Sequence, residues 1–326
     1  MSTGLSYLCQ RLVLEYIEPN RRIQISSQCL TISQLEKSHP FYLKRLKFDN
    51  NLIKINNIKY EIEEHEEELE EILTAGDIRI GPNPRRYISK YTEITFTNLD
   101  FRKSYAKRVP LVFHEAMKRL GCALFEGRKN IRVNILKIDI YDDKVLRLPV
   151  GFLVRPRDLI TGFNSPQDFL TIIHPSSFPL RLLKIWLNAP ENLELPMLKT
   201  AEHVIINGIE NENFPTLPFL HNRFVIFDLI WSPDEQVFGL IREWLTCKAR
   251  STVCLLKRFD KDETENLLNA VKNEFDGDIN EREGTDESML PDSISISLSM
   301  TSTTVLILYG IEKEEDFYVR MEILEK

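Results

Sequence analysis

Two places in this 326-residue chain combine residue types that could do chemistry. His114 begins a predicted helix like the first histidine of an H-E-x-x-H zinc motif, but Lys118 stands where the second histidine is needed. Asp139, Asp142 and Asp143 follow a predicted strand, where carboxylates can hold Mg²⁺. Carboxylates are equally common in plain turns. We therefore expect His114 to be an ordinary helix residue and the three aspartates to form a turn, with no metal at either place.

The sequence contains none of the common catalytic or nucleotide-binding motifs. We find no G-x-G-x-x-G, no P-loop and no G-x-S-x-G elbow. We therefore expect no catalytic residue and no cofactor, and an enzyme remains only as the default alternative.

The middle of the chain is strongly basic although the whole chain has a net charge of −7. Residues 79–137 carry 14 Lys and Arg against 4 Asp and Glu, interleaved with aromatic residues. Such clusters are typical of sites for anionic partners, and the candidate patch is Arg85, Arg86, Lys107 and Arg108. Alternatively, these cations pair with acidic blocks at 61–71 and 260–283, or they are spread around the domain. Since the sequence contains no nucleic-acid motif, nucleic acid is a less favoured partner than protein.

Cysteine usage favours a reducing compartment. The five cysteines are scattered and include no C-x-x-C pair: Cys9, Cys29, Cys122, Cys247 and Cys254. The first residues lack the pattern of a signal peptide, and no apolar run reaches the length that spans a bilayer. We expect an intracellular protein, cytoplasmic or nuclear, with no membrane partner.

The first forty residues are predicted to form short helices. Apolar residues recur there at helical spacing: Leu5, Leu8, Leu12, Val13, Tyr16 and Ile17. Pro19 ends this helix and can open the next one. Ile23 and Leu30 continue an apolar face up to Pro40.

Alternating residues then predict a middle region rich in strands. Short strands are expected at 46–48, 52–55, 58–62 and 91–98, with Asn-rich turns between the first three. The acidic block at 61–71 is expected to be an exposed helix or loop. A predicted helix at 110–125 leads to a strand at 132–140, and the strand–helix–strand order indicates a parallel pair.

The second half repeats a strand-like pattern at a loose interval. Strands are expected at 182–187, 203–206, 224–230 and 252–256, with centres about 20, 20 and 28 residues apart, within the range of leucine-rich repeats. Two helices are expected at 234–245 and 263–275, and a linker at 276–291. Three strands in a meander are expected to end the chain, at 293–298, 303–309 and 317–324.

Residues 5–29, LSYLCQRLVLEYIEPNRRIQISSQC, resemble the opening of an F-box. Five apolar residues match its hydrophobic positions: Leu5, Val13, Leu14, Ile17 and Ile23. Further segments are similar to the nematode F-box C proteins, in which a degenerate F-box precedes an associated domain of unknown function: 40–62, 127–138, 148–159, 172–185, 240–256 and 274–278.

We predict a mixed α/β (α+β) fold in three parts. These are an F-box-like helical segment at 1–40, a family-specific α/β domain at 41–160, and a leucine-rich-repeat-like partner-binding region at 170–326 that ends in β-strands. The resemblance implies a non-enzymatic substrate receptor of a cullin-RING (SCF-type) ubiquitin ligase. The partners would be a Skp-type adaptor, bound through the five apolar residues, and an unknown substrate.

A second interpretation uses the same residues differently. Ser6 stands where F-boxes usually have proline, and the first 50 residues contain no tryptophan. A short helical cap on the following domain would need the same five residues for its own core: Leu5, Val13, Leu14, Ile17 and Ile23. The alternative is therefore an interaction or scaffold protein whose degenerate F-box no longer binds the adaptor.

Overall fold

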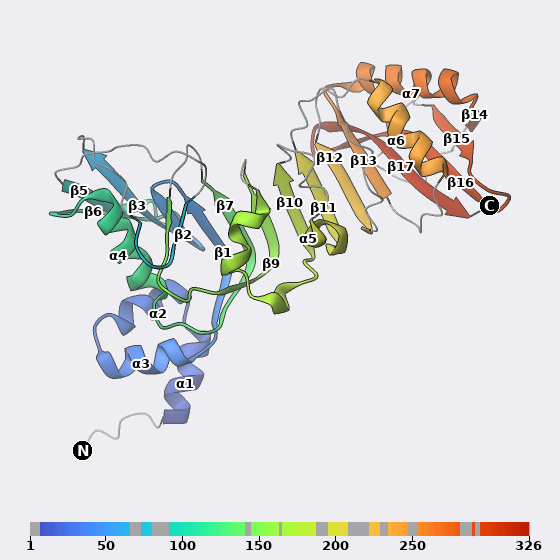
Figure 1. The fold of residues 1–326 in the computed structure, drawn as a ribbon. Coiled ribbons are helices and arrows are strands. Elements are labelled where there is room, and N and C mark those ends of the chain that lie inside the picture. Colours follow the sequence, from blue (N-terminus) through green and yellow to red (C-terminus); the bar gives the residue numbers. More distant parts are fainter. Residues whose placement is uncertain are drawn as a thin grey trace. The chain divides into compact units, whose positions relative to one another are not determined.

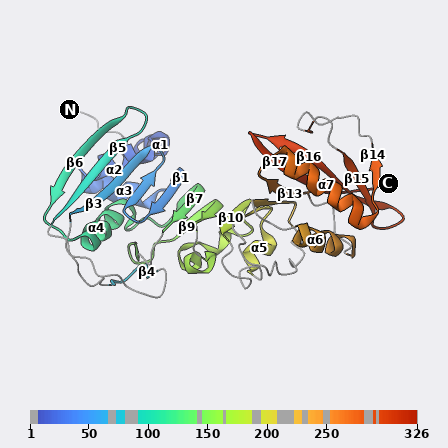
Figure 2. The ribbon, with the colours of Figure 1, turned by 90° about the horizontal axis from the view of Figure 1, so that it is seen from above.

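The computed structural model describes residues 7–65, 73–79, 91–140, 145–162, 165–186, 195–207, 222–228, 234–246, 253–280, 289–290 and 294–325. Contacts within the chain divide it into two compact units, unit 1 at Met1–Ser177 and unit 2 at Phe178–Lys326. Helices pack beside strands in both units (Figures 1 and 2), which confirms the mixed α/β class.

Unit 1 contains three N-terminal helices, a mixed sheet and a fourth helix. Its helices are α1 (Tyr7–Tyr16), α2 (Pro19–Ser26), α3 (Leu30–Ser38) and α4 (Phe113–Phe125), with 3-10 turns at Pro166–Ile172 and Pro175–Ser177. Its strands are β1 (Phe41–Asp49), β2 (Leu52–Ile55), β3 (Ile58–His65), β4 (Asp77–Arg79), β5 (Tyr91–Asn98), β6 (Lys103–Val109), β7 (Ile131–Asp139), β8 (Val145–Arg147) and β9 (Val154–Thr161).

The N-terminal helices follow the sequence prediction closely. Pro19 occupies the first position of α2, where its missing N–H costs nothing, and Glu18 caps the helix by accepting from the backbone N–H groups of Asn20 and Arg21. The segment predicted for residues 1–40 is thus helical over α1 to α3 and lies in unit 1.

The main sheet of unit 1 has the described strand order β9-β7-β1-β2-β3-β5-β6. β7 runs parallel to β1 and to β9, while β1, β2, β3, β5 and β6 pair antiparallel in sequence. The strand after α4 was expected to pair in parallel with the strand before it. That prediction is wrong about the partner, because β6 follows β5 as a hairpin and β7 crosses to β1.

Helix α4 covers one face of this sheet and completes the core. Its buried stripe includes Met117, Leu120 and Leu124, and the helix contacts β3, β5 and β8. Gly121 allows that approach, because a Cβ there would lie 2.6 Å from the carbonyl oxygen of Arg147.

Two further expectations for unit 1 need correction. The first part of the acidic block at 61–71 is strand and not helix or loop, because β3 continues to His65 and pairs with β5. The rest of the block lies outside the described residues. The strand β6 was not predicted at all, since its cations occupy both faces and no polar–apolar alternation marks it.

Unit 2 begins with parallel strands and ends in an antiparallel meander. Its helices are α5 (Pro196–Thr200), α6 (Asp234–Thr246) and α7 (Lys261–Phe275). Its strands are β10 (Leu182–Trp186), β11 (His203–Asn207), β12 (Phe224–Asp228), β13 (Val253–Arg258), β14 (Asp278–Asn280), β15 (Ser295–Ser299), β16 (Thr304–Lys313) and β17 (Asp316–Glu325).

The four strands predicted at a loose interval form a parallel ladder. Leu182 of β10 pairs with His203 of β11, which pairs with Phe224 of β12, which pairs with Val253 of β13. Buried residues alternate with half-buried ones along β10, β11 and β12, as expected when one face of a sheet is fully covered. A leucine-rich-repeat arc stays a prediction, because a parallel ladder alone does not distinguish it from other α/β sheets.

The C-terminal meander is confirmed. β15, β16 and β17 pair antiparallel, and β17 also pairs antiparallel with β13. Helix α7 packs on this part of the sheet, and its N-terminus is capped by Asp260, whose side chain accepts from the N–H of Glu263. The linker expected at 276–291 holds a strand instead, because β14 pairs with β15.

Candidate functional site

The five apolar residues of the predicted adaptor site differ in their exposure to solvent. Val13 is 45% exposed on α1, whereas Leu14 is 4% exposed and belongs to the core. Ile17 and Ile23 are half-buried. Leu5 lies outside the described residues. Leu14 is therefore unavailable to a partner, which corrects the prediction at that position.

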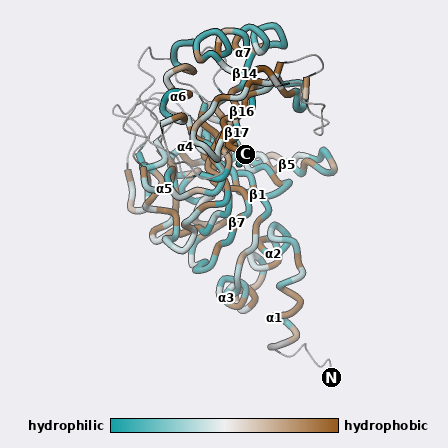
Figure 3. The backbone as a smooth tube through the Cα atoms, turned by 90° about the vertical axis from the view of Figure 1, so that its right-hand side faces the viewer, coloured by the Kyte–Doolittle hydropathy of each residue, from teal (hydrophilic) through white to brown (hydrophobic). Residues whose placement is uncertain are grey.

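The exposed apolar surface of α1 includes two residues that the candidate set omitted. Leu12 is 57% and Tyr16 89% exposed, and with Val13 they occupy one side of the helix. Figure 3 shows apolar residues along α1. Ile25 on α2 and Leu30 on α3 are exposed as well. We call Leu12, Val13 and Tyr16 the α1 face; the sequence holds no signal that separates these apolar residues from the buried Leu14.

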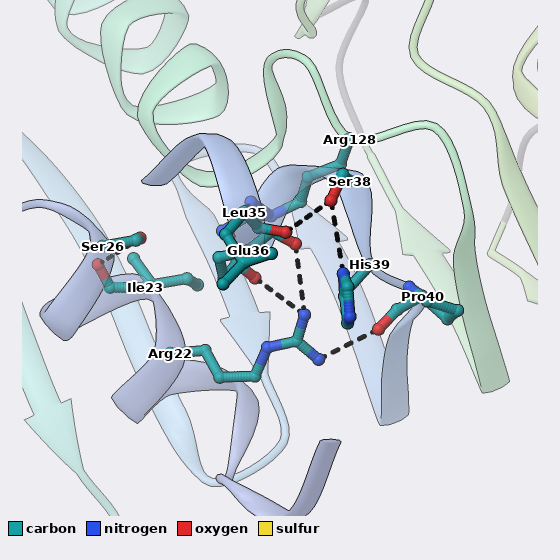
Figure 4. Close-up of polar contacts among 9 residues, drawn as sticks. All are labelled: Arg22, Ile23, Ser26, Leu35, Glu36, Ser38, His39, Pro40 and Arg128. Atoms are coloured by element: carbon teal, nitrogen blue, oxygen red, sulfur yellow. Dashed lines mark hydrogen bonds and ion pairs between the residues drawn. The ribbon is translucent and has the colours of Figure 1, made fainter. Parts of the chain in front are cut away.

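A buried ion cluster ties the helices to the sheet domain. Glu36 of α3 lies between two guanidinium groups, with Arg22 of α2 at 3.1 Å and Arg128, which follows α4, at 2.6 Å. All three side chains are almost completely buried, and Figure 4 shows them converging. Arg22 also donates to the carbonyl oxygen of Pro40 at 2.9 Å. We call Arg22, Glu36 and Arg128 the buried triad.

Burial and pairing act in opposite directions on the two arginines. Burial lowers the pKa of the Arg22 and Arg128 guanidinium groups, and the Glu36 carboxylate opposes that shift. Both groups also lie over the ring of Phe41, with centroid distances of 5.3 and 4.5 Å. The first residue of β1 therefore contacts both guanidinium groups of the buried triad, one from α2 and one from the residues after α4.

A second, polar junction joins α2 to the turn between β2 and β3. Asn20 donates to the carbonyl oxygen of Ile55 at 3.0 Å and accepts from the hydroxyl of Tyr60 at 2.8 Å. Asn56 donates to the Glu18 carboxylate at 3.2 Å. Burial, and secondarily the charge of Glu18, raise the pKa of Tyr60, which keeps its hydroxyl protonated as a donor. These bonds fix the orientation of α2.

Several cations of the basic stretch form ion pairs with carboxylates of unit 1. Lys118 pairs with Asp77 at 2.7 Å, Lys137 pairs with Asp139 at 2.6 Å, and Arg128 belongs to the buried triad. Their partners are single carboxylates elsewhere in unit 1. For these three cations, the partners that the structure describes lie outside the acidic blocks at 61–71 and 260–283.

The predicted anionic-partner patch is only partly described. Lys107 and Arg108 lie on the exposed strand β6, and Arg108 pairs with Glu93 at 3.2 Å. Arg85 and Arg86 lie outside the described residues.

The candidate metal ligands are placed as follows. His114 is the second residue of α4. Asp139 is paired with Lys47 at 3.2 Å as well as with Lys137, and Asp142 and Asp143 fall outside the described residues. Within the part of the chain that the structure describes, no three His, Cys, Asp or Glu side chains gather in a way that could hold a metal ion.

Comparison with known proteins gives one match. The family model of a domain of unknown function (DUF3557) matches residues 112–252, from the start of α4 to the residues just before β13. The resemblance predicted a domain of unknown function, and this match confirms one over these residues; the F-box and the nematode family stay predictions. The helices α1 to α3 and the strand β6 precede the matched residues. No curated protein and no solved structure matches the chain.

None of the helices in the described ranges combines the length and the apolar character needed to cross a bilayer.

Proposed function

We propose that this chain is a non-enzymatic substrate receptor of a cullin-RING (SCF-type) ubiquitin ligase, which docks on a Skp-type adaptor through α1. The α1 face carries the proposal: Leu12, Val13 and Tyr16 are large apolar side chains left in solvent on a ten-residue helix. An amphipathic helix of this kind can enter an apolar groove of a partner. The resemblance of residues 5–29 to an F-box supports the choice of partner.

The attachment of the helices supports the same role. A receptor must hold its adaptor-binding helices in a fixed position relative to the domain that follows. The buried triad and the Asn20 junction supply rigid connections from α2 and α3 to the sheet of unit 1. A specific interface would bury on the order of 1,200–2,000 Å², so α1 would contribute together with exposed residues of α2 and α3 such as Ile25 and Leu30.

The role would place the chain in the cytoplasm or nucleus, as the cysteine pattern favours. The remaining partner, the ubiquitinated substrate, would bind elsewhere on the chain. Nucleic acid receives less support, because Lys118, Arg128 and Lys137 of the basic stretch already face carboxylates.

Capture by purified Skp-type adaptors tests the proposal. The full-length chain is compared with Val13→Asp, which alters the α1 face, and with Asn266→Asp, which adds the same charge at an exposed position of α7 in unit 2. We expect capture of the parent chain and of Asn266→Asp, and loss of capture for Val13→Asp with an unchanged circular dichroism spectrum. If no adaptor captures the parent chain, the cap interpretation replaces the receptor.

A further inference from the structure

Strand β6 is the outermost described strand of the unit 1 sheet. It pairs with β5 on one side, and among the described residues no strand pairs with its other side (Figure 2). Side chains from Lys103 to Arg108 are exposed on both faces of the strand. An edge of this kind presents a row of backbone N–H and C=O groups that can pair with another extended chain.

One face of β6 has an ordered chemical pattern. Lys103, Tyr105 and Lys107 alternate along it, since every second residue of a strand points to the same side. Tyr105 is 66% exposed and stands opposite Phe96 of β5. Within the described residues, neither lysine forms a salt bridge. Arg108, by contrast, points to the other face and pairs with Glu93.

The sheet behind Lys103, Tyr105 and Lys107 is well packed and holds β6 in a fixed register. Phe96 packs edge-on against Tyr60, with ring centroids 5.1 Å apart, and Tyr60 is buried. The register of β6 on β5 continues over seven residue pairs, from Asn98–Lys103 to Thr92–Val109. The edge is therefore a preformed strand, so a partner would not have to order it.

We propose that β6 binds an extended acidic segment of a partner protein by adding it as a further strand. Cross-strand neighbours lie directly opposite each other, so a partner with an acidic residue, an aromatic or large apolar residue, and a second acidic residue at every second position would match Lys103, Tyr105 and Lys107. The assignment of this segment to the ligase substrate rests on the proposed function, whereas the binding itself does not.

The exposed backbone favours a peptide over a nucleic acid. A peptide strand would pair with the N–H and C=O groups on the side of β6 where no described strand lies, as well as with the two lysines. A nucleic-acid strand would use only the lysines and the rings, because its backbone cannot continue the ladder. Its affinity would come from a row of phosphate contacts, for which this face of β6 provides two cations four residues apart.

The test uses the full-length chain without any adaptor, so its failure would leave the docking of α1 untouched. The probe is a fluorescent, capped threonine peptide with a central tyrosine and a glutamate two residues to either side. Binding is followed by anisotropy, and amide hydrogen exchange of residues 103–109 shows whether the edge becomes protected. A second peptide of equal charge carries prolines between these residues and cannot pair as a strand.

Two double variants separate the lysines of β6 from net charge. Lys103→Glu/Lys107→Glu reverses the proposed contacts, while Lys44→Glu/Lys129→Glu makes the same change at exposed lysines of β1 and of the loop after α4. We expect the first to weaken binding about tenfold or more and the second to change it less than about threefold. We also expect the peptide without prolines, and not the proline peptide, to slow the amide hydrogen exchange of β6.

Three results would overturn the proposal. Equal binding of the proline peptide would show charge attraction without strand addition. Unchanged affinity of Lys103→Glu/Lys107→Glu would place the peptide elsewhere. Tight binding of a single-stranded oligonucleotide in the absence of peptide binding would assign the face to nucleic acid.

Discussion

The helical segment α1–α3 and the strand β6 are both exposed parts of unit 1, but they are attached by different interactions. The helices are held by the buried triad, in which charges are removed from water and paired. β6 is held by one side of a hydrogen-bonded ladder, and its Arg108–Glu93 pair lies at the surface. Because water screens the second pair and not the first, similar residue types differ greatly in what they contribute to stability. In our two proposals, the helical segment is a fixed platform for docking and β6 is a template for an added strand.

The largest expected effect follows from breaking the buried triad. Glu36→Ala leaves Arg22 and Arg128 buried without their carboxylate, which costs about 3–5 kcal/mol in the free energy of unfolding. Urea denaturation followed by far-ultraviolet circular dichroism measures it.

The sequence supplies an internal control for that measurement. All three tryptophans, Trp186, Trp231 and Trp244, belong to unit 2, so their fluorescence follows unit 2 in the same samples. If Glu36→Ala lowers the free energy of unfolding by less than about 1 kcal/mol, the buried triad does not hold the helices in place.

The next effect separates two neighbouring residues of α1. Leu14→Ala removes a buried side chain and should cost about 2–5 kcal/mol, whereas Val13→Ala on the α1 face should change the free energy of unfolding by less than about 0.5 kcal/mol. Denaturation of both variants under identical conditions gives the difference. Equal costs would contradict the division of α1 into a core side and a docking side.

A pH-dependent effect is expected from Asp77. Burial alone would raise the pKa of its carboxyl, but hydrogen bonds from Lys118, Thr74 and Arg147 lower it below its ordinary value of 3.8. A depressed pKa in the folded state gives stability that is present above the ordinary value and is lost as the pH falls below it. We expect Asp77→Asn to cost about 1–3 kcal/mol at neutral pH and less at about pH 3. A penalty independent of pH would show that the charge of Asp77 is not the cause.

The smallest effect is expected at the surface of β6. Arg108→Ala breaks the exposed pair with Glu93 and should cost only about 0.2–1 kcal/mol. The same denaturation assay applies, with and without added salt, since salt screens an exposed pair. If Arg108→Ala lowered the free energy of unfolding as much as Glu36→Ala, the buried triad and the surface pair of β6 would not differ in their contribution to stability.

Much of the fold could be predicted from local patterns. Pro19 and the apolar spacing around it gave the break between the first two helices, and strand periodicity gave the ladder of unit 2. The buried triad could not be predicted, because Glu36 and Arg128 meet across 92 residues and Arg128 resembles any other cation of the basic stretch. Val13 and Leu14 are equally apolar, so only packing against other elements decides which of them is exposed.

Hydrogen exchange of the full-length chain with and without a Skp-type adaptor tests the central claim most directly. The amides of α1 and the accessible parts of α2 and α3 should become protected, while those of Lys103–Val109 should not change. Protection of β6 by the adaptor, with α1 unaffected, would contradict the assignment of docking to the helices.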